Sequence, residues 1–301
     1  MKKIKSLIYK EKWAAVLLAG PGVFWLTFWV ILPFLFAVGY SFTNRTLVIN
    51  PKLGTSLVGL KNYIELFQDR DFLQSFWNTL RFTILAVPIQ CTLAIFLAVL
   101  LNNKVKGIGF FRLIYFMPLV IPILVVSITW SLLFKPDESG FINNIISLLT
   151  FGHVEGLKWL FSAETAMISI VILSVWAGVG MQTIVILAGL QSVDTSLYEA
   201  AVLDGAGTAQ KFWYVTIPSI RNTLIFVYLS STIMSFKLFT QVLVLTQGGP
   251  LNSTTSVVYK IYKTGYIDQR IGYASSMSVV FFIGVLLLSL VQQKFTKMTS
   301  D

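Results

Sequence analysis

Long apolar stretches separated by short polar segments make up most of this 301-residue chain. A helix needs about twenty apolar residues to cross roughly 30 Å of hydrocarbon. Six stretches meet this requirement and predict six membrane-spanning helices, over residues 13–42, 78–101, 113–134, 165–190, 222–245 and 271–293. The first stretch is too long for the apolar core of a cleaved signal peptide, which runs about 7–15 residues, so we expect it to remain as an anchor.

Composition supports a lipid environment. Only 12% of the residues are charged, whereas soluble domains carry about 25%, and the mean hydropathy is +0.76. The single cysteine, Cys91, excludes a disulfide within the chain and a cysteine-cluster metal site, and the single histidine, His153, is expected in a loop. We therefore predict an all-α, polytopic membrane protein, with residues 1–12 as a tail and residues 13–301 as one transmembrane domain.

The charges of the loops predict the orientation. If the N-terminus is cytoplasmic, its side of the membrane collects twelve Lys and Arg residues, and the other side collects nine on longer loops. The density therefore differs about twofold in the direction expected when basic loops face the cytoplasm. Both termini and the loop at residues 191–221 are predicted to be cytoplasmic. We attribute the net charge of +10 to this bias and expect no nucleic-acid partner.

Two basic residues fall inside the predicted spans. Arg81 is near the outer end of the second helix, from which its side chain can reach water. Lys237, in "MSFKLFTQ", is deeper, and a charge at such a depth indicates a functional site by default. The alternative is a lysine that pairs with a backbone carbonyl or lines water without touching a substrate, and the sequence leaves both open.

Proline and aromatic residues shape two other segments. Pro118 and Pro122 lie four residues apart in "MPLVIP", on one face of the third predicted helix, which we expect to be markedly bent. Such breaks line cavities in transporters or are simply tolerated kinks. Before the second span, aliphatic and aromatic residues within 62–77 predict a short amphipathic helix along the membrane interface.

The sequence contains no motif of a soluble enzyme. There is no G-x-x-x-x-G-K-[ST] phosphate loop, no H-E-x-x-H and no G-x-S-x-G, and paired carboxylates occur only in loops. We expect neither an ATPase site nor a bound cofactor in this chain. Energy for any transport must then come from another subunit or from an ion gradient.

The cytoplasmic segment "SVDTSLYEAAVLDGAGTAQKFWYVTIPSIRNT" has the signals of two short helices. Ser196 and Glu199 match a capping box, with the serine as N-cap and the glutamate three residues on. The first helix is predicted over residues 197–204 and ends at Gly205, which supplies a left-handed turn. Thr208 is expected to cap the second helix. The result is a helical elbow. Glu199 is expected either to cap its own helix only or also to meet a basic residue of a partner, and the two roles are compatible.

The same segment resembles the EAA coupling loop of ABC importer permeases. That pattern reads E-A-A, three residues, G, nine residues, I-x-L-P. The matching residues are Glu199, Ala200, Ala201, Gly205 and Pro218, while Val215 and Ile217 replace the usual isoleucine and leucine. The resemblance implies that the elbow, with Asp204 at the end of its first helix, inserts into a cleft of a cytoplasmic ATPase and transmits its closure to the membrane helices.

Three further segments resemble carbohydrate-uptake permeases of the maltose and multiple-sugar types. They are "GLKNYIELFQDRDFLQSFWNTLRFT", "LTQGGPLNSTTSVVYKIYKTGY" and "IGYASSMSVVFFIG", so the resemblance covers most of the chain from about residue 55. Six spans and a short first external loop favour the simpler multiple-sugar or oligosaccharide type. The resemblance implies a permease domain over residues 13–301, in the cytoplasmic (inner) membrane of a bacterium and surrounded by lipid.

The resemblance also implies partners and a mechanism. These are a second related permease, an ABC ATPase dimer that binds ATP and magnesium, and an extracellular or periplasmic sugar-binding protein. ATP binding would close the ATPase dimer and open the paired permeases outward. The docked elbow must then bind differently in the two states, because a contact equal in both would shift nothing.

A sugar pathway needs amides and hydroxyls beside aromatic faces. The candidates within the spans are Ser127, Trp130, Trp176, Gln182, Ser235, Lys237 and Gln241. On one continuous helix the last three do not share a face, so they cannot all point into one cavity. Packing is the alternative for each of these side chains.

Two other functions remain open. A permease for a solute such as glycerol phosphate would favour a cationic cavity, for which Lys237 and Arg81 are available. An ion-coupled carrier or channel would need intramembrane carboxylates, and the predicted spans contain no Asp or Glu.

Overall fold

The computed structural model describes residues 2–48, 54–102, 108–137, 140–153 and 156–298. These residues form helices and connecting loops, with one isolated antiparallel bridge between Thr43 and Leu57 and no strand. The all-α prediction is confirmed. The chain divides into two compact units, one of residues 1–68 with 261–282 and the other of residues 69–260 with 283–301.

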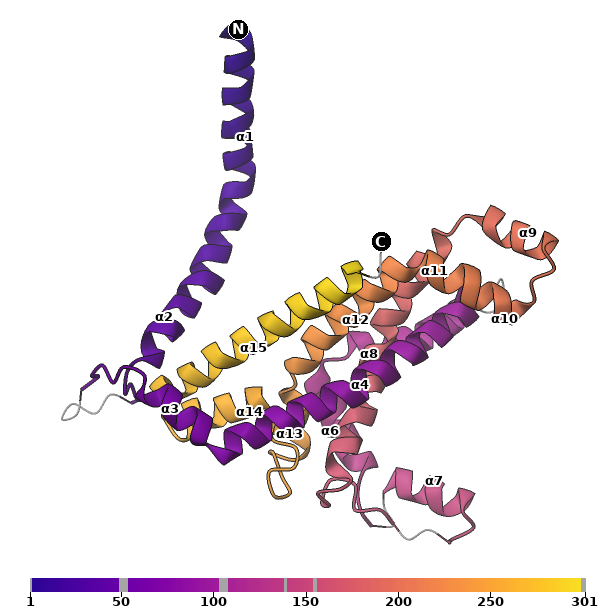
Figure 1. Ribbon diagram of the computed structural model, residues 1–301. Helices are drawn as coiled ribbons and strands as arrows, with labels where there is room; N and C mark the ends of the chain where they lie inside the picture. Colours follow the sequence, from indigo (N-terminus) through magenta and orange to yellow (C-terminus); the bar gives the residue numbers. More distant parts are fainter. Residues whose placement is uncertain (1, 49–53, 103–107, 138–139, 154–155, 299–301) are drawn as a thin grey trace. The chain divides into compact units, whose positions relative to one another are not determined.

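The first unit begins with three helical segments that follow one another without a gap. Its elements are α1 (Lys2–Leu26), the π-helical turn η1 (Thr27–Ile31), α2 (Leu32–Ser41), α3 (Lys61–Gln68), the π-helical turn η3 (Lys263–Ile267) and the first part of α15 (Ile271–Met298) (Figure 1). The predicted interfacial segment is shorter than expected, since α3 ends at Gln68. It is amphipathic, with Ile64 and Phe67 exposed and Asn62 and Leu66 buried.

Two polar contacts hold α3 within the first unit. The Asn62 Nδ2 atom donates to the carbonyl oxygens of Ser41 and Thr43, at 2.8 and 2.9 Å. The Arg270 guanidinium pairs with the Glu65 carboxylate at 2.6 Å. A buried amide with two carbonyl partners has its desolvation compensated, so Asn62 fixes the helix against the end of α2.

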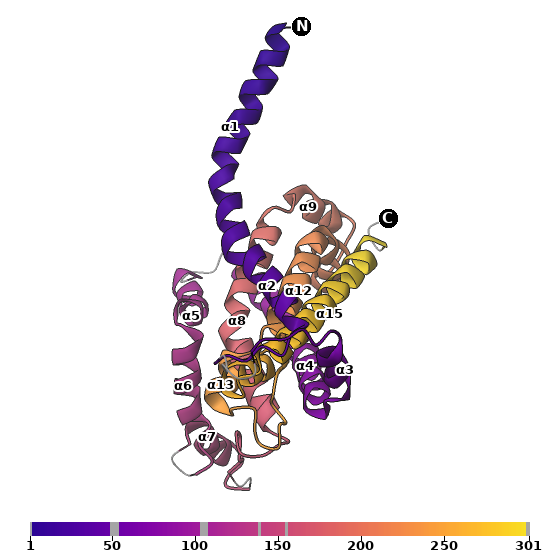
Figure 2. The ribbon, with the colours of Figure 1, turned by 90° about the vertical axis from the view of Figure 1, so that its left-hand side faces the viewer.

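The second unit holds the remaining helices. They are α4 (Arg70–Asn102), α5 (Ile108–Val120), α6 (Ile123–Leu133), α7 (Phe141–Leu149), α8 (Ala166–Gln191), α9 (Thr195–Leu203), α10 (Thr208–Lys211), η2 (Phe212–Thr216), α11 (Ile217–Ser219), α12 (Arg221–Phe236), α13 (Thr240–Leu245) and α14 (Val257–Tyr262), with the end of α15. The last two residues of α14 belong to the first unit. Figures 1 and 2 show α4, α8 and α12 side by side.

Four helical stretches of the described chain are long and apolar enough to cross a membrane: Trp13–Ser41, Arg70–Asn102, Ala166–Gln191 and Ile271–Lys294. The third predicted span is divided into α5 and α6 at Pro122, whose ψ of 133° takes the backbone out of the helix. The expected bend is therefore a complete break. The fifth predicted span is divided as well, because α12 ends at Phe236 and α13 starts at Thr240.

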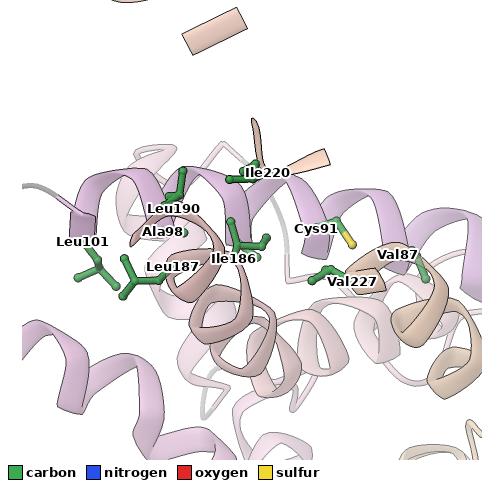
Figure 3. Close-up of a cluster of buried hydrophobic side chains, with 10 residues drawn as sticks. Val87, Cys91, Ala98, Leu101, Ile186, Leu187, Leu190, Ile220 and Val227 are labelled. Carbon is green, nitrogen blue, oxygen red and sulfur yellow. The ribbon is translucent and has the colours of Figure 1, made fainter. Parts of the chain in front are cut away.

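A cluster of small and aliphatic side chains joins α4, α8 and α12 (Figure 3). Its buried members are Val87, Cys91, Ala94, Ala98, Leu101, Ile186, Leu187, Leu190, Ile220 and Val227. Alanines on α4 let the helix backbones approach closely, which is how membrane helices gain packing energy without a hydrophobic driving force. Gly180 serves the same purpose toward α5, since a Cβ there would lie 2.4 Å from the Tyr115 carbonyl oxygen.

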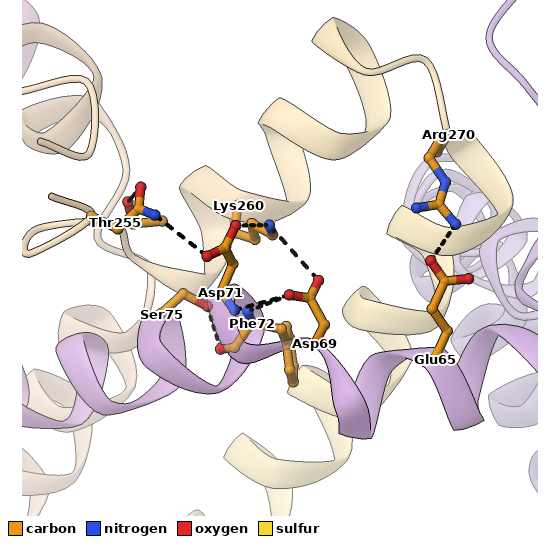
Figure 4. Close-up of polar contacts among 9 residues, drawn as sticks. Glu65, Asp69, Asp71, Phe72, Ser75, Thr255, Lys260 and Arg270 are labelled. Atoms are coloured by element: carbon orange, nitrogen blue, oxygen red, sulfur yellow. Dashed lines mark hydrogen bonds and ion pairs between the residues drawn. The ribbon is translucent and has the colours of Figure 1, made fainter.

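The loop of residues 246–256 is anchored to the start of α4. The Asn78 Nδ2 atom donates to the carbonyl oxygens of Asn252 and Thr255, at 2.7 and 3.1 Å. Near the same helix end, the Lys260 ammonium lies 3.2 Å from the Asp71 carboxylate and 3.7 Å from that of Asp69 (Figure 4). The loop therefore has a defined conformation set by polar contacts rather than by regular structure.

Candidate functional site

The elbow between α8 and α12 begins with a capped helix. Asp194 is the N-cap of α9, and its Oδ1 atom accepts from the Ser196 backbone N–H at 2.9 Å. This bond favours the charged form, so the pKa of the Asp194 carboxyl lies below its usual value. The predicted capping box is wrong, because an aspartate two positions earlier takes the N-cap role and leaves Ser196 as the second helical residue.

This shift changes the role of Glu199. The residue lies in the middle of α9, two positions beyond the site from which a side chain could cap the helix. Its side chain is exposed and forms no hydrogen bond or ion pair with any residue that the structure describes. The carboxylate is therefore free for an external group. Ala200 is exposed beside it, and Ala201 is half-buried.

The end of α9 follows the predicted pattern. Gly205 has a φ of +78°, in the left-handed region that favours glycine. The N–H of Gly205 donates to the Val202 carbonyl at 3.0 Å, and the N–H of Ala206 donates to the Ala201 carbonyl at 2.8 Å. These bonds satisfy carbonyls that the helix end would otherwise leave unpaired. The prediction that the helix stops at Gly205 is confirmed, with Asp204 exposed as the C-cap.

The second leg of the elbow consists of α10, η2 and α11. The N-cap of α10 is Gly207, whose N–H donates to Gln210 Oε1 at 2.8 Å. The prediction of Thr208 as the cap is therefore wrong by one residue, because glycine also tolerates this position. Pro218 is exposed and lies in α11, which continues directly from the π-helical turn η2.

One side-chain hydrogen bond ties the two legs together. The Tyr198 hydroxyl on α9 lies 3.0 Å from the Thr216 Oγ1 atom at the end of η2. Thr216 is buried and also donates to the Lys211 carbonyl at 3.3 Å. Because α9 has no buried residue, this bond is a main link between α9 and the second leg of the elbow, which leads to α12.

The outer surface of the elbow is hollowed, apolar and acidic. A hollow of about 350 Å³ lies between the legs and is lined by Ala201, Asp204, Gly205, Ala206, Gln210, Tyr214 and Val215. Leu203 and Tyr214 are 89% and 80% exposed at its edge. Large exposed apolar side chains gathered with carboxylates are typical of a surface that another protein covers.

Both ends of the elbow are rooted in the helix cluster described above. Leu190 ends the buried face of α8 before the elbow, and Ile220 follows α11 directly after it. The two side chains are 4% and 1% exposed and belong to the same cluster (Figure 3). Both ends of the elbow are therefore packed into the same buried cluster as α4 and α8.

The candidate pathway residues fall into separate contacts. The rings of Trp130 and Trp176 lie 5.5 Å apart, so the structure brings these two together. Lys237 is exposed at the break between α12 and α13, so the expectation of a continuous helix through it is wrong. The amides bond instead to serines: Gln182 Nε2 to Ser231 at 3.0 Å, and Gln241 Nε2 to Ser174 at 3.4 Å.

These two serines, Ser231 and Ser174, are not among the candidates predicted from the sequence. The Ser231 Oγ atom accepts a hydrogen bond from the Gln182 amide and also lies 3.9 Å from the Cys91 sulfur. The Gln182 Oε1 atom is buried and has no hydrogen-bond partner among the residues that the structure describes. The available signal was a serine inside each apolar stretch, but sequence alone does not show which helix faces which. Among the described residues, no group of three or more His, Cys, Asp or Glu side chains is placed to hold a metal ion.

Residues 90–299, which include the elbow and most of the helix cluster, match the family described as "Binding-protein-dependent transport system inner membrane component". The chain belongs to this family. It is 32% identical to the trehalose/maltose transport system permease protein MalF of Thermococcus litoralis, with 98% of each chain covered. It is 30% identical to the sn-glycerol-3-phosphate transport system permease protein UgpA of Yersinia pestis, over 91% of this chain and 94% of the relative.

A solved structure has the same fold. It is a bacterial alginate ABC transporter in complex with an alginate pentasaccharide-bound periplasmic protein. The TM-score is 0.82 at 21% identity, with 97% of this chain and 96% of the other covered. The elbow and the broken helices thus belong to a binding-protein-dependent permease rather than to an ion-coupled carrier.

Proposed function

We propose that this chain is a permease subunit of an ATP-driven importer that moves a sugar or oligosaccharide across the bacterial cytoplasmic membrane. The observation that carries the proposal is the elbow of residues 191–221. Its outer surface exposes Glu199, Leu203 and Tyr214, while both of its ends are rooted in the buried cluster. An exposed surface that is packed at both ends against the membrane helices can couple a conformational change of a bound partner to those helices.

The proposed partner at the elbow is a cytoplasmic ABC ATPase dimer, which would bind ATP and magnesium. Glu199 has a free carboxylate, so a basic residue of the ATPase would gain a charge-assisted hydrogen bond. The hollow beside Asp204 and Gly205 would receive a side chain of the same partner. The further partners are a second related permease and an extracellular or periplasmic sugar-binding protein, in line with the family's dependence on a binding protein.

The proposed topology has six spans with both termini in the cytoplasm. Four spans are the long apolar helices, and the other two are the broken pairs α5–α6 and α12–α13. Irregular backbone within a membrane is tolerated where it lies inside protein or lines a water-filled cavity. The breaks at Pro122 and at Lys237 are therefore the proposed places where the span lines a pathway.

Sugar is favoured as the substrate by the maltose-type relative and by the ring pair on α6 and α8. Trp176 is exposed and packs on Trp130, and an exposed indole offers a sugar ring an apolar face on which to stack. The second candidate is a glycerol phosphate, as in the UgpA relative, because Lys237 is exposed at the helix break. A phosphate would require this charge, whereas a neutral sugar would not.

The test is uptake by the whole importer in proteoliposomes, with the partner permease, the ATPase and the binding protein. We expect ATP-dependent sugar uptake that Glu199→Lys abolishes, because the charge reversal repels the basic group of the ATPase. Glu164→Lys, an exposed glutamate outside the elbow, is the control and should transport normally. Normal uptake by the Glu199→Lys importer, or uptake driven by an ion gradient without the ATPase, would contradict the proposal.

The two substrates are separated in the same assay. Binding of a sugar by the cognate binding protein and sugar uptake by Lys237→Gln would support the sugar. Uptake of sn-glycerol 3-phosphate that is lost in Lys237→Gln would support the second candidate instead.

A further inference from the structure

The helix α7 exposes an apolar face while it buries one side-chain amide. Phe141, Ile145, Leu148 and Leu149 are all exposed, and Leu148 is 77% exposed. Their spacing of four, seven and eight residues places them on one face, within an arc of about 100°. Asn143, on the opposite face, is buried. A helix in water normally buries the apolar face and exposes the amide.

Hydrogen bonds prevent α7 from rolling over. The Asn143 Nδ2 atom donates to the carbonyls of Lys135 and Leu157, at 3.2 and 3.1 Å. Its Oδ1 atom accepts from the Leu157 N–H at 3.1 Å and from the Trp159 indole at 2.8 Å. All donors and acceptors that the amide commonly uses are thus engaged. Burying the apolar face against the protein would break these four bonds, so its exposure is built into the fold.

The position of α7 identifies what faces it. The helix follows α6 and precedes α8 in the chain, and both ribbon views show it beyond the end of α6 (Figures 1 and 2). α8 is long and apolar enough to span the membrane, and in the proposed topology its first residue, Ala166, lies near the outer membrane boundary. Ile168 and Ile172, in the first turns of α8, are also exposed apolar residues. Exposed apolar side chains thus occur both on α7 and at the start of the span that follows it.

The chemistry of the segment agrees with a lipid boundary. Residues 140–152 contain no charged side chain. Phe151, directly after α7, is 90% exposed and has a φ of +53°. A bulky residue rarely adopts this left-handed conformation. The chain thus presents another large apolar group outward at the cost of backbone strain, which would have no benefit in water.

We propose that α7 is an interfacial helix, and that its face of Phe141, Ile145, Leu148 and Leu149 inserts at the boundary between lipid headgroups and acyl chains. Interfacial helices bury such faces to about 5–10 Å. In the predicted orientation this is the outer leaflet. Since α7 carries no charge, its insertion does not depend on anionic lipid. The helix fixes the height of the loop between α6 and α8, and this role is separate from the transport reaction.

The experiment places a fluorescent probe on each side of α7 in the full-length permease. Leu148→Cys and, as the matched control, Ser147→Cys are labelled with an environment-sensitive dye, in the assembled importer in lipid nanodiscs. Ser147 is exposed as well but lies about 100° around the helix from Leu148. Native Cys91 is buried, and the chain without a new cysteine measures any labelling there.

We expect the Leu148 probe to emit at shorter wavelength and to be quenched several-fold more strongly by lipids that carry a nitroxide near the headgroup. The result should be the same in phosphatidylcholine alone and with added phosphatidylglycerol. Equal quenching at positions 147 and 148 would overturn the proposal. So would protection of position 148 that appears only when the binding protein is added and without lipid quenching, because the face would then belong to a protein partner.

Discussion

The hydrogen bond between Tyr198 and Thr216 gives the sharpest prediction about the elbow. It joins α9, which has no buried residue, to the leg that leads into the helix cluster. Tyr198→Phe removes the hydroxyl and keeps the ring, and Thr216→Val removes the partner and keeps the shape. Each change leaves α9 more mobile before it docks on the ATPase. The entropy that α9 loses when it becomes ordered then weakens binding to the ATPase.

The expected magnitude follows from one partly buried hydrogen bond. Such a bond contributes about 1 kcal/mol net, which corresponds to about a fivefold change in an equilibrium constant. Each single variant should therefore need about five times more ATPase for half-maximal assembly. Thr216→Val should be slightly worse, because this hydroxyl also bonds to the Lys211 carbonyl. The double variant should need no more ATPase for half-maximal assembly than Thr216→Val alone, since the one hydrogen bond that the two side chains share cannot be lost twice.

The assay is titration of the ATPase against the permease pair in nanodiscs, with sugar uptake per ATP hydrolysed as the second readout. Tyr266→Phe is the control, because it deletes an exposed hydroxyl outside the elbow. Additive effects of the two variants would refute the argument, because they would show that the two side chains act independently. Unchanged assembly in both would refute it too.

Three further changes test the elbow and the helix packing. Gly205→Ala should destabilise the elbow by about 1 kcal/mol through its positive φ alone, since apart from its chain neighbours no described residue has an atom within 4 Å of the new Cβ. Gly205→Pro should abolish ATP-coupled uptake while the chain still inserts in the membrane. Asp194→Ala should speed amide hydrogen exchange at the start of α9, and Asp194→Asn should speed it less, because its neutral amide oxygen still accepts from the Ser196 N–H but without the charge. In the wild type a partial speeding, like that of Asp194→Asn, should appear only at acidic pH, because the lowered pKa keeps the capping carboxylate charged until the pH falls through it. Gly180→Ala should lower the thermal stability of the permease by about 1–3 kcal/mol, because its Cβ would meet the Tyr115 carbonyl, while Gly284→Ala, with open space, should not. Unchanged amide exchange in α9 of the Asp194→Ala variant would contradict the capping role. Equal stability of Gly180→Ala and Gly284→Ala would contradict the close packing at Gly180.

The sequence by itself determined the features that depend on local chemistry. Hydropathy identified every helical region that the structure places in a candidate span, since burying backbone in lipid requires long apolar helices. Gly205 ends α9 as predicted, because only glycine adopts its left-handed turn without strain. The spacing around Glu199, Gly205 and Pro218 was sufficient to identify the family, which the match over residues 90–299 confirms.

Tertiary structure decided the features that depend on which surfaces meet. Two candidate N-caps, Asp194 and Ser196, lie within one turn, and their local propensities are nearly equal, so only the folded elbow shows that Asp194 caps. The break at Lys237 has no proline or glycine to predict it. The exposed apolar face of α7 depends on Asn143 reaching carbonyls that lie up to fourteen residues away. Periodicity reveals that a helix has two faces, but it does not reveal which of them the rest of the chain will bury.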